Sequence, residues 1–462
     1  EKELASITTK ALSRSFSLLQ LTAKSSGRYA KLRLGDLFVE KNQKEKRFNL
    51  FLTQQAFFLV EELGRLKGSI MKAGQMLSVY GEHFFPPEVN KVLRTLQADS
   101  RPVAWSAIKK TIEEELGPFF SDLDIHKKPV AAASMGQVYK AVIKKTGETI
   151  ALKVQYPGVD SAISSDLKAL RRILALTRLI PEGSGFDGIY KEIEMMLRHE
   201  IDYEREAKIL KTYGSRLKND SRFVIPSYYS KYSSKKVLAM SYEEGFAVAS
   251  KKVANLSQLR RNRLAAALMD QMFREIFQWR MVQTDPHFGN YKIKLGKSAS
   301  GCDDKVILLD FGAVRRFPIR YIGPFARIVE GALTKKPSLS VRAAKELGFL
   351  KAGDSKKSLE LFSKVCRTAI EGFDRNYRSP RCDGTDPGKN PYNWGDTDLI
   401  QKLADLGKDA VFAFKLRAPP REAVFMDRKM VGTYTLLAKL GLKMGPYDMI
   451  LNYLKPHRNK KK

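Results

Sequence analysis

The N-terminal part of the chain has the hydrophobic pattern of helices. Apolar residues fall at helix-compatible spacings over three segments: 3–49, 50–79 and 103–116. Consecutive prolines at 86 and 87 follow the second segment, and Gly117-Pro118 follows the third. These residues stop a helix, because proline lacks the amide hydrogen and clashes with the preceding turn. The sequence therefore predicts a helical extension over residues 1–118.

The pattern changes to that of strands after this extension. Two β-rich runs, 137–143 and 149–155, flank Lys145-Thr146-Gly147, and together they predict a β-hairpin. Three further elements are predicted beyond it: helices at 161–179 and 189–210, and a strand at 237–240. We expect residues 119–245 to form a small β-rich lobe with a helical insert.

The remainder of the chain is mainly helical. In one long helix, apolar residues repeat every four positions, at Leu264, Leu268, Met272 and Ile276. An apolar strand at 306–309 follows, and helices continue to Leu454. Open loops are expected at 294–305 and 375–396. A larger helical lobe over 246–462 therefore follows the β-rich lobe, which predicts an α+β fold.

Composition and charge narrow the possible partners. Of 462 residues, 43% are hydrophobic and 29% charged, so the chain can bury a core and is not a disordered tail. The formal net charge of +32 calls for an anionic partner such as phospholipid, nucleotide phosphate or nucleic acid. The basic residues are spread over the whole chain without an aromatic-interleaved cluster, which argues against nucleic acid.

The cysteines argue against a structural metal site, and the apolar runs argue against a membrane-spanning helix. Cys302, Cys366 and Cys382 form no zinc-type motif, so we expect a reducing compartment and no structural metal. No apolar run reaches the roughly 20 residues that span a bilayer. The chain begins with Glu1 and not Met, which leaves room for a removed targeting peptide or anchor.

The two ends of the chain are candidates for membrane contact. The N-terminal helical segment carries Leu12 and Phe16 among basic residues such as Arg14 and Lys24, a pattern that suits an anionic membrane surface. An ordinary solvated helix face fits this pattern equally well. The basic end, 458–462, is the second candidate.

A carboxylate follows the apolar strand near residue 306. Residues 306–312 read Val-Ile-Leu-Leu-Asp-Phe-Gly, which places Asp310 at the end of a buried strand. A carboxylate buried without a partner is costly, so a cation such as Mg²⁺ is expected beside it. Asp-Phe-Gly taken alone is also an ordinary turn after a strand.

A second polar loop lies upstream, at residues 283–290, directly after the long amphipathic helix. Asp285 and Asn290 are five residues apart, the spacing of the base and the metal-binding Asn in a kinase catalytic loop. With Asp310 they could hold Mg²⁺ on ATP and orient a hydroxyl group. His287, in the same loop, is interpreted as a hydrogen-bonding support.

A lysine interrupts an aliphatic strand at 150–154. Lys153 follows the predicted hairpin as the phosphate-binding lysine does in the kinase Val-Ala-Ile-Lys strand, although an edge-strand lysine that blocks aggregation is the simpler explanation. Kinases also need a helical Glu to hold this lysine, and residues 200–207 offer four acidic candidates. Glu200 and Glu206 would lie about 120° apart on one helix and should face different partners.

An alanine-rich segment occupies the place of a glycine-rich phosphate loop. Residues 129–137 read Pro-Val-Ala-Ala-Ala-Ser-Met-Gly-Gln. Alanine carries a β-carbon where backbone would approach phosphate, so we expect a stiffer loop that holds nucleotide differently. Read alone, the three alanines fit the start of a helix.

Taken together, these motifs resemble the UbiB/AarF atypical kinase-like family. The family's KxGQ signature is present as Lys72-Ala73-Gly74-Gln75, and the resemblance runs from about Arg65 to Gly312 over six ordered motifs. The run Lys-Val-Gln-Tyr-Pro-Gly-Val at 153–159 is closest to the coenzyme-Q branch, whereas His-Phe-Gly at 287–289 differs from the Asn-Trp-Ser typical of that branch.

The resemblance implies a bilobal, protein-kinase-like fold with a role for each motif. Lys153 would contact phosphate and pair with Glu206, Asp285 would be the catalytic base, and Asn290 and Asp310 would hold the metal. The implied nucleotide loop comprises Ala131, Ala132, Ala133, Ser134 and Gly136. The implied regulatory set comprises Lys72 and Gln75 of the KxGQ helix, with Glu200 and Asp202 as the acidic partners. Lys153, Asp285, Asn290 and Asp310 are expected to act on one Mg²⁺-bound ATP.

The resemblance also implies a function. In this family the KxGQ helices cover the place where an ordinary kinase receives a peptide, which leaves ATP hydrolysis or phosphorylation of a lipid-like small molecule. Support of isoprenoid-quinone synthesis at a membrane surface, with other biosynthetic proteins as partners, is the expected role. A catalytically weak, ATP-gated scaffold is the alternative. The expected location is peripheral membrane or cytoplasm in a bacterium, or the matrix side of a mitochondrion.

Overall fold

A computed structural model describes residues 103–133, 135–176, 186–373, 391–413 and 420–457, with isolated positions between Arg47 and Leu77. Several predictions fall outside the described residues. They concern nearly all of the N-terminal helical segment, the basic end 458–462, and the predicted site residues Gln75 and Ser134. The chain divides into two compact units, one comprising Glu1–Lys211 and Ser227–Tyr242, the other Thr212–Pro226 and Glu243–Lys462.

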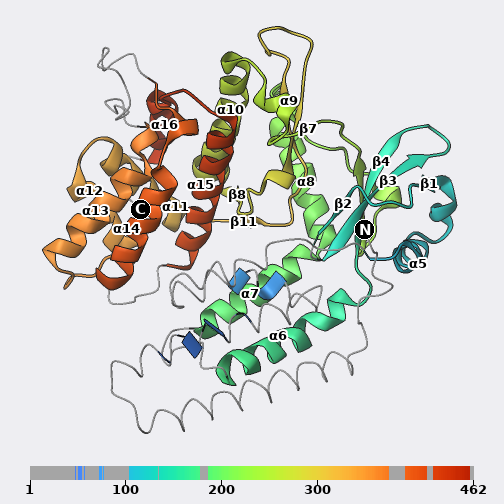
Figure 1. Cartoon of the computed structure of the whole chain (residues 1–462), viewed down its shortest axis with the longest axis horizontal. Helices are drawn as coiled ribbons and strands as arrows, with labels where there is room; N and C mark the ends of the chain where they lie inside the picture. The colour runs from blue at the N-terminus through green and yellow to red at the C-terminus, as the bar shows by residue number, and fades with distance from the viewer. Residues whose placement is uncertain are drawn as a thin grey trace. The chain divides into compact units, whose positions relative to one another are not determined.

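The first unit contains a five-stranded antiparallel sheet (Figure 1). Its strands are β1 (Leu123–Ile125), β2 (Ala131–Ala132), β3 (Gly136–Ile143), β4 (Thr149–Gln155) and β6 (Val237–Ser241), in the order β1-β3-β4-β6, with β2 paired to β3. The predicted hairpin is confirmed as β3 and β4, and Gly147 in its turn has a positive φ of 72°. The strand predicted at 237–240 is confirmed as β6.

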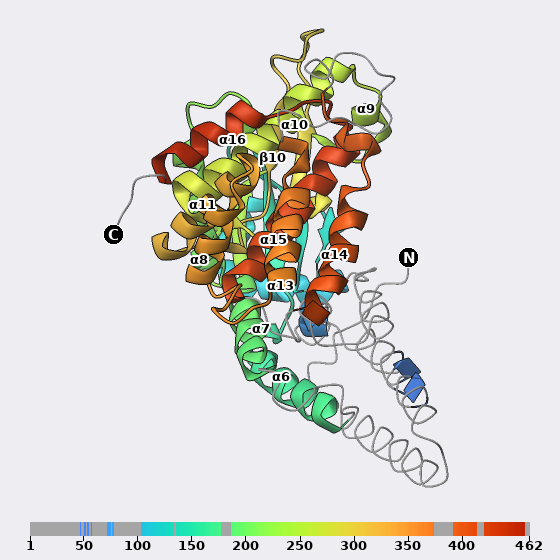
Figure 2. The same cartoon turned by 90° about the vertical axis from the view of Figure 1, so that its left-hand side faces the viewer.

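Helices come before the strands of this sheet and between them along the chain. They are α5 (Trp105–Leu116), α6 (Val159–Leu176), α7 (Phe186–Glu200) and α8 (Tyr203–Leu217), with 3₁₀ turns at Gly117–Asp122 and Ser230–Tyr232. The predicted stop at Gly117 is confirmed, since its φ of 53° favours glycine. Helices α6 and α7 pack side by side, as both views show (Figures 1 and 2).

The prediction of one helix over 189–210 is wrong, because α7 and α8 are separate helices. Asp202 caps α8, since its Oδ1 accepts a hydrogen bond from the amide of Arg205 at 2.9 Å. The carbonyl of Ile201, at the break, accepts a hydrogen bond from the buried side-chain amide of Gln155 on β4 as well as one from the amide of Tyr203. Capping and a tertiary contact thus override a continuous helical pattern.

The second unit contains a four-stranded and a two-stranded sheet. The first has the order β5 (Phe223–Val224), β10 (Lys305–Leu308), β9 (Tyr291–Lys294), β7 (Phe246–Ala247), in which β10 is parallel to β5 and antiparallel to β9. The second pairs β8 (Met281–Gln283) with β11 (Val314–Arg316). Val306 and Ile307 are fully buried, as their apolar run predicts.

The second unit is mainly helical, as predicted. Its helices are α9 (Lys251–Ala254), α10 (Gln258–Phe273), α11 (Ile319–Leu333), α12 (Pro337–Glu346), α13 (Lys356–Ala369), α14 (Leu399–Ala413), α15 (Arg421–Leu440) and α16 (Tyr447–Leu454). A π-helix, Arg274–Trp279, continues α10, and 3₁₀ turns form at Phe288–Asn290, Glu371–Phe373, Trp394–Asp396 and Lys455–His457. Helix α15 lies along α10 and beside α14 (Figure 2).

The predicted apolar face of the long helix is confirmed, because Leu264, Leu268, Met272 and Ile276 are all buried. Among the helices that the structure describes, none combines the length and the apolar character needed to span a bilayer. The mixed helix and sheet content confirms the predicted α+β class.

Candidate functional site

Lys153 of β4 and Glu206 of α8 form a buried ion pair in the first unit. The Nζ atom of Lys153 lies 2.8 Å and 2.9 Å from the two carboxylate oxygens of Glu206. The Glu206 side chain is 0% exposed and that of Lys153 is 15% exposed. Separating two charges at this depth would cost several kcal/mol, so the pair holds the lysine in one position. The Lys153 ammonium also lies 5.3 Å from the Tyr203 ring centroid.

The position of β4 rules out the simpler explanation for Lys153. Strand β4 pairs with β3 on one side and β6 on the other, so it is a central strand and not an edge strand. A lysine there cannot serve to block edge-to-edge aggregation. Lys153 needs a partner in the interior, and Glu206 provides it.

The alanine-rich segment forms the tip of a hairpin and not the start of a helix. Ala131 and Ala132 make up β2, and the amide of Ala133 donates to the carbonyl of Gly136 at 2.8 Å. Ala131, Ala132 and Ala133 are exposed, so their backbone is accessible to a ligand. The hydroxyl of Tyr156 donates to the carbonyl of Ala133 at 2.9 Å, which ties the tip to the end of β4.

Gly136 follows the tip and is buried at the start of β3. A β-carbon at this position would lie 2.4 Å from the carbonyl oxygen of Val154 and 3.0 Å from the hydroxyl of Tyr203. Only glycine therefore allows β3 and β4 to approach this closely. Gly136 shapes the hairpin from within the sheet.

Lys72 of the KxGQ segment contacts an acidic residue at the end of α7. Its Nζ atom lies 3.0 Å from Oε2 of Glu200, and the two side chains are 16% and 25% exposed. Asp202, the other acidic residue in the implied pair, caps α8. Glu200 and Glu206 face different partners, as predicted. They do so because they lie on different helices, α7 and α8, and not because they are about 120° apart on one helix.

In the second unit, Gln283 connects the two carboxylate-bearing loops. Its Nε2 donates to the carbonyl of Asp310 at 2.7 Å, and its Oε1 accepts from the amide of Asp285 at 3.0 Å. The side-chain amide of Asn290 then donates to the carbonyl of Asp285 at 2.8 Å, and the carbonyl of Asn290 accepts from the amide of Leu309. Asp285, Asn290 and Asp310 thus belong to one hydrogen-bonded group.

The loop between Asp285 and Asn290 is held by local hydrogen bonds. Nδ1 of His287 accepts from the amide of Gly289 at 3.1 Å, and the Thr284 hydroxyl donates to the carbonyl of Ala313 at 2.8 Å. His287 therefore acts as a support, as predicted. Oδ1 of Asp310 accepts from the amide of Gly312 at 2.9 Å, which turns the chain directly after the carboxylate.

Arg428 on α15 is a residue of this site that sequence reasoning missed. Its guanidinium lies 2.6 Å from Oδ1 of Asp285, although the two residues are 143 positions apart. One turn further along α15, a β-carbon on Gly432 would lie 2.2 Å from Cγ of Pro286. The missing side chain of Gly432 lets α15 approach the loop closely enough for Arg428 to reach Asp285. No local motif could have revealed this contact.

A buried ion pair between α15 and the π-helix holds the end of β8, at Gln283. Lys429, next to Arg428, lies 2.6 Å from Glu275, and both side chains are almost fully buried. Glu275 also accepts hydrogen bonds from the amide of Gln283 and from the Tyr213 hydroxyl. Adjacent residues of α15 therefore contact the Asp285 carboxylate and Glu275, which holds the end of the strand that leads to the loop.

Tyr291, at the start of β9, lies next to the carboxylates of this site. Burial raises the pKa of its phenol well above the ordinary value, and the negative charges of Glu275, Asp285 and Asp310 raise it further. The phenol therefore stays neutral, and all three carboxylates are near enough to act on it.

The buried ring of Phe311 packs on Tyr213, with 5.0 Å between centroids, so the Asp-Phe-Gly turn is anchored by its middle residue.

The oxygen donors of the loop fit a magnesium ion carried by a nucleotide. Asn290 uses its side-chain nitrogen for a hydrogen bond, and within the described ranges its Oδ1 has no protein partner. Asp310 places its carboxylate at the turn, where Oδ1 accepts from the amide of Gly312. Amide and carboxylate oxygens are hard ligands, and Mg²⁺ in phosphoryl-transfer sites takes few protein ligands and completes its shell with phosphate and water.

Comparison with known proteins assigns the chain to a family. The model of the ABC1 atypical kinase-like domain matches residues 95–342, which include the Lys153 strand and both carboxylate-bearing loops. The chain belongs to this family. The resemblance to UbiB/AarF proteins is thereby confirmed.

Similar proteins include the mitochondrial atypical kinase COQ8B of Danio rerio, with 30% identity over 85% of this chain and 60% of the relative. The atypical kinase COQ8 of Schizosaccharomyces pombe has 30% identity over 86% of this chain and 62% of the relative. The chain thus spans about three fifths of the length of these two relatives. Rv3197 of Mycobacterium tuberculosis, solved with erythromycin, has a TM-score of 0.55 at 22% identity and covers 84% of this chain and 92% of its own. The fold is kinase-like, as expected.

Proposed function

We propose that this chain is a Mg²⁺-dependent ATPase or small-molecule kinase of atypical type. The observation that carries the proposal is the hydrogen-bonded group of Asp285, Asn290 and Asp310, joined through Gln283. When ATP is bound, its Mg²⁺ would supply charge neutralisation at the transferred phosphoryl group. Asn290 and Asp310 would hold the ion, and Asp285 would orient and deprotonate the attacking hydroxyl or water.

The residues of the first unit complete the proposed assignment. Glu206 holds the Lys153 ammonium in place, and in kinases a lysine of this kind contacts the α- and β-phosphates of ATP. The exposed backbone at Ala131, Ala132 and Ala133 would cover the phosphates. Because alanine restricts the backbone more than glycine does, we expect slower nucleotide exchange than with a glycine-rich loop.

Replacement of Asp310 by Asn tests the proposal. The variant should retain the fold but lose Mg²⁺-dependent nucleotide binding or turnover, because a neutral amide cannot replace the charge on a cation ligand. Asp409→Asn, in an exposed position of α14, is the matched control and should behave like the wild-type chain. Unchanged ATPase activity in Asp310→Asn, measured as released phosphate, would reject the proposal.

The biological role we propose is support of isoprenoid-quinone or lipid metabolism at a membrane surface. The names of the COQ8 relatives support the quinone pathway and, for a eukaryotic source, the mitochondrion. The ion pair of Lys72 with Glu200 anchors the KxGQ segment to α7 and supports a role different from peptide phosphorylation. Stimulation of ATP turnover by a lipid extract, but not by generic peptide substrates, would be the expected result.

A second candidate is a catalytically weak, ATP-gated scaffold of a biosynthetic complex. The ion pair of Arg428 with Asp285 favours it, because a carboxylate that already neutralises a guanidinium is a poor proton acceptor. Asp285→Ala separates the two candidates. A scaffold should keep its cellular function with this variant, whereas a phosphotransferase should lose it.

A further inference from the structure

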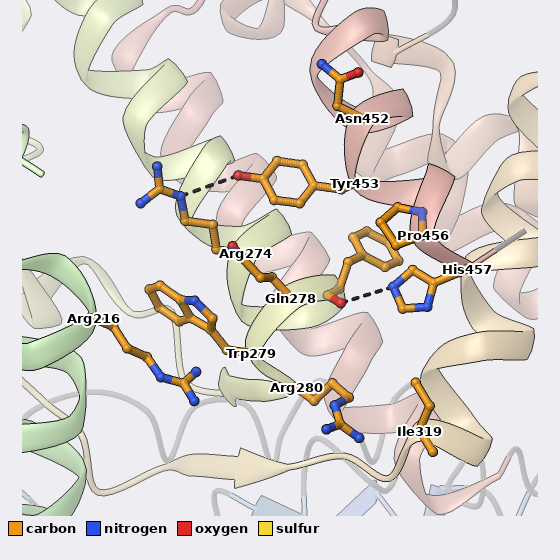
Figure 3. Close-up of a pocket in the computed structure, with 11 residues that line it drawn as sticks. Arg216, Arg274, Gln278, Trp279, Arg280, Ile319, Asn452, Tyr453, Pro456 and His457 are labelled. Atoms are coloured by element: carbon orange, nitrogen blue, oxygen red, sulfur yellow. Dashed lines mark hydrogen bonds between the residues drawn. The ribbon is translucent and has the colours of Figure 1, made fainter. Parts of the chain in front are cut away.

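An open cleft of about 1000 Å³ lies in the second unit, at the opposite end of β8 from Gln283. It is formed by the end of α8, the π-helix, the start of α11 and the C-terminal turn after α16. Its lining residues include Arg216, Arg274, Trp279, Arg280, Tyr453 and His457 (Figure 3). A cleft of this size can hold a small organic molecule.

Hydrogen bonds and ion pairs connect the walls of the cleft. Nε2 of His457 hydrogen-bonds to the carbonyl of Phe277 at 3.0 Å and joins the C-terminal turn to the π-helix (Figure 3). The hydroxyl of Tyr453 donates to Asp270, which in turn pairs with Arg274 at 2.9 Å. The carbonyl of Arg280 accepts from the amide of Phe317 at 2.9 Å.

The positive charges of the cleft are only partly neutralised. Arg274 pairs with Asp220 and Asp270, each at 2.9 Å. By contrast, Arg216 and Arg280 have no carboxylate within ion-pair distance in the described part of the chain. Partial burial lowers the pKa of Arg216, Tyr213 opposes this effect, and the nearby guanidinium of Arg316 lowers the pKa further. The cleft therefore carries excess positive charge.

Arg280 is held in an unusual backbone conformation. Its φ of 54° lies in the left-handed region, which costs a residue with a β-carbon about 1 kcal/mol or more. The residue lies between the π-helix and β8, and a glycine there would relieve the strain. The arginine side chain lines the cleft instead.

Trp279 supplies a flat apolar surface beside these charges. The Arg216 guanidinium lies 5.1 Å from the centroid of the indole (Figure 3). This contact orients the guanidinium while leaving its hydrogen-bond donors available to a ligand. Guanidinium forks match the paired oxygens of a phosphate group, and an aromatic wall favours an organic body attached to it.

We propose that this cleft is a phosphate-binding site, distinct from the residues assigned to ATP and Mg²⁺. Arg216 and Arg280 bind the phosphate oxygens, and Trp279 contacts the attached organic group. The same chemistry is offered by a soluble phosphate ester and by a phospholipid headgroup. Neither the family assignment nor the proposed ATP chemistry requires this site.

Calorimetric titration of the full chain tests the proposal, with glycerol 3-phosphate as the soluble probe in Mg²⁺-free buffer. Sedimentation with phosphatidylcholine vesicles, with and without phosphatidic acid, provides the membrane arm. Arg216→Gln/Arg280→Gln should weaken binding of the effective probe at least about tenfold, because two charge-assisted contacts are lost. Arg342→Gln, an exposed arginine of α12, is the matched control and should bind normally.

Two further readouts locate the site. Binding should change the tryptophan fluorescence of the wild-type chain but not that of Trp279→Phe, and Asp310→Asn should bind the probe normally. Binding of glycerol 3-phosphate identifies a soluble ester, and binding only to phosphatidic acid vesicles identifies a lipid headgroup. The proposal is overturned if neither probe binds, if the folded double variant binds as well as the wild type, or if Arg342→Gln is weakened equally.

Discussion

At the level of single side chains, Lys153 combines a structural cost with a proposed chemical role. Its ion pair with Glu206 lies in the interior of the first unit, where a hydrophobic pair of similar volume would be about as stable. Stability alone does not explain the pair. The proposed contact of Lys153 with nucleotide phosphate would require a positive charge fixed in this way.

Substitution of Lys153 can separate its effect on stability from its proposed contact with nucleotide phosphate. Lys153→Met leaves the Glu206 carboxylate buried without its partner, so we expect a loss of about 3 kcal/mol in the free energy of unfolding. The double variant Lys153→Met/Glu206→Met should regain most of that stability but not nucleotide binding. Urea unfolding and nucleotide titration of both variants provide the measurements. If the double variant bound nucleotide normally, Lys153 would have no role in phosphate contact.

Asp220 is the centre of a second set of ion pairs, in the second unit. It accepts two hydrogen bonds from the Arg222 guanidinium and lies 2.9 Å from Arg274. The hydrogen bond from the Arg222 side chain is the main cause that lowers the pKa of Asp220 from 3.8 to about 2. A carboxyl group whose pKa falls on folding stabilises the fold above its unfolded pKa and loses this effect as the pH falls.

We therefore predict that Asp220→Asn changes the acid stability of the chain. The variant should be less stable than the wild type at pH 7 by about 1 kcal/mol, because the partners are partly exposed and solvent weakens the interaction. The difference should shrink between about pH 4 and about pH 2. Chemical unfolding across this range measures it. The prediction fails if the two stabilities differ by the same amount at every pH.

At the level of helices and strands, α15 packs on the loop at 283–290 although it lies far away in sequence. It presents Arg428 to Asp285 and Lys429 to Glu275, and the absence of a side chain at Gly432 brings it against Pro286. Helix packing distances depend on the residues at the contact, and glycine permits the closest approach.

The spacing between α15 and the loop can be tested with alanine substitutions of two helical glycines. Gly432→Ala should destabilise the chain by about 1–3 kcal/mol and lower turnover, since the added carbon would overlap Pro286. Gly407→Ala, on α14 with nothing within 4 Å of the new carbon, should stabilise it by about 0.5–1 kcal/mol. Thermal unfolding and ATPase assays compare the two. Equal effects would show that α15 is not closely packed on the loop.

At the level of the whole molecule, the net charge of +32 attracts the chain to anionic partners and surfaces. The described residues carry no helix able to cross a bilayer, and the predicted membrane contacts lie outside them. Binding to anionic surfaces must then be measured directly.

A salt series distinguishes the two classes of anionic partner. We predict that vesicles containing cardiolipin retain the chain at physiological ionic strength, whereas binding of duplex and single-stranded oligonucleotides falls steeply as salt rises. Co-sedimentation and pulldown at matched phosphate concentrations measure both. Preference for nucleic acid across the series would end the membrane interpretation.

The local elements of the chain could be predicted from its sequence because they depend on neighbouring residues. The hairpin of β3 and β4, the helix stop at Gly117 and the buried strand before Asp310 follow from alternation, turn residues and apolar runs. The candidate site residues on these elements could be proposed from the sequence motifs in the same way. Their roles stay predictions until the substitutions above are made.

Contacts between distant segments could not be predicted in this way. Gln155 and Asp202 divide a continuous helical pattern into α7 and α8, β6 makes β4 a central strand, and Arg428 reaches Asp285 across 143 positions. Periodicity and motif spacing describe how a segment relates to its own neighbours. Hydrogen bonds, ion pairs and close packing between segments arise only when the folded chain brings those segments together.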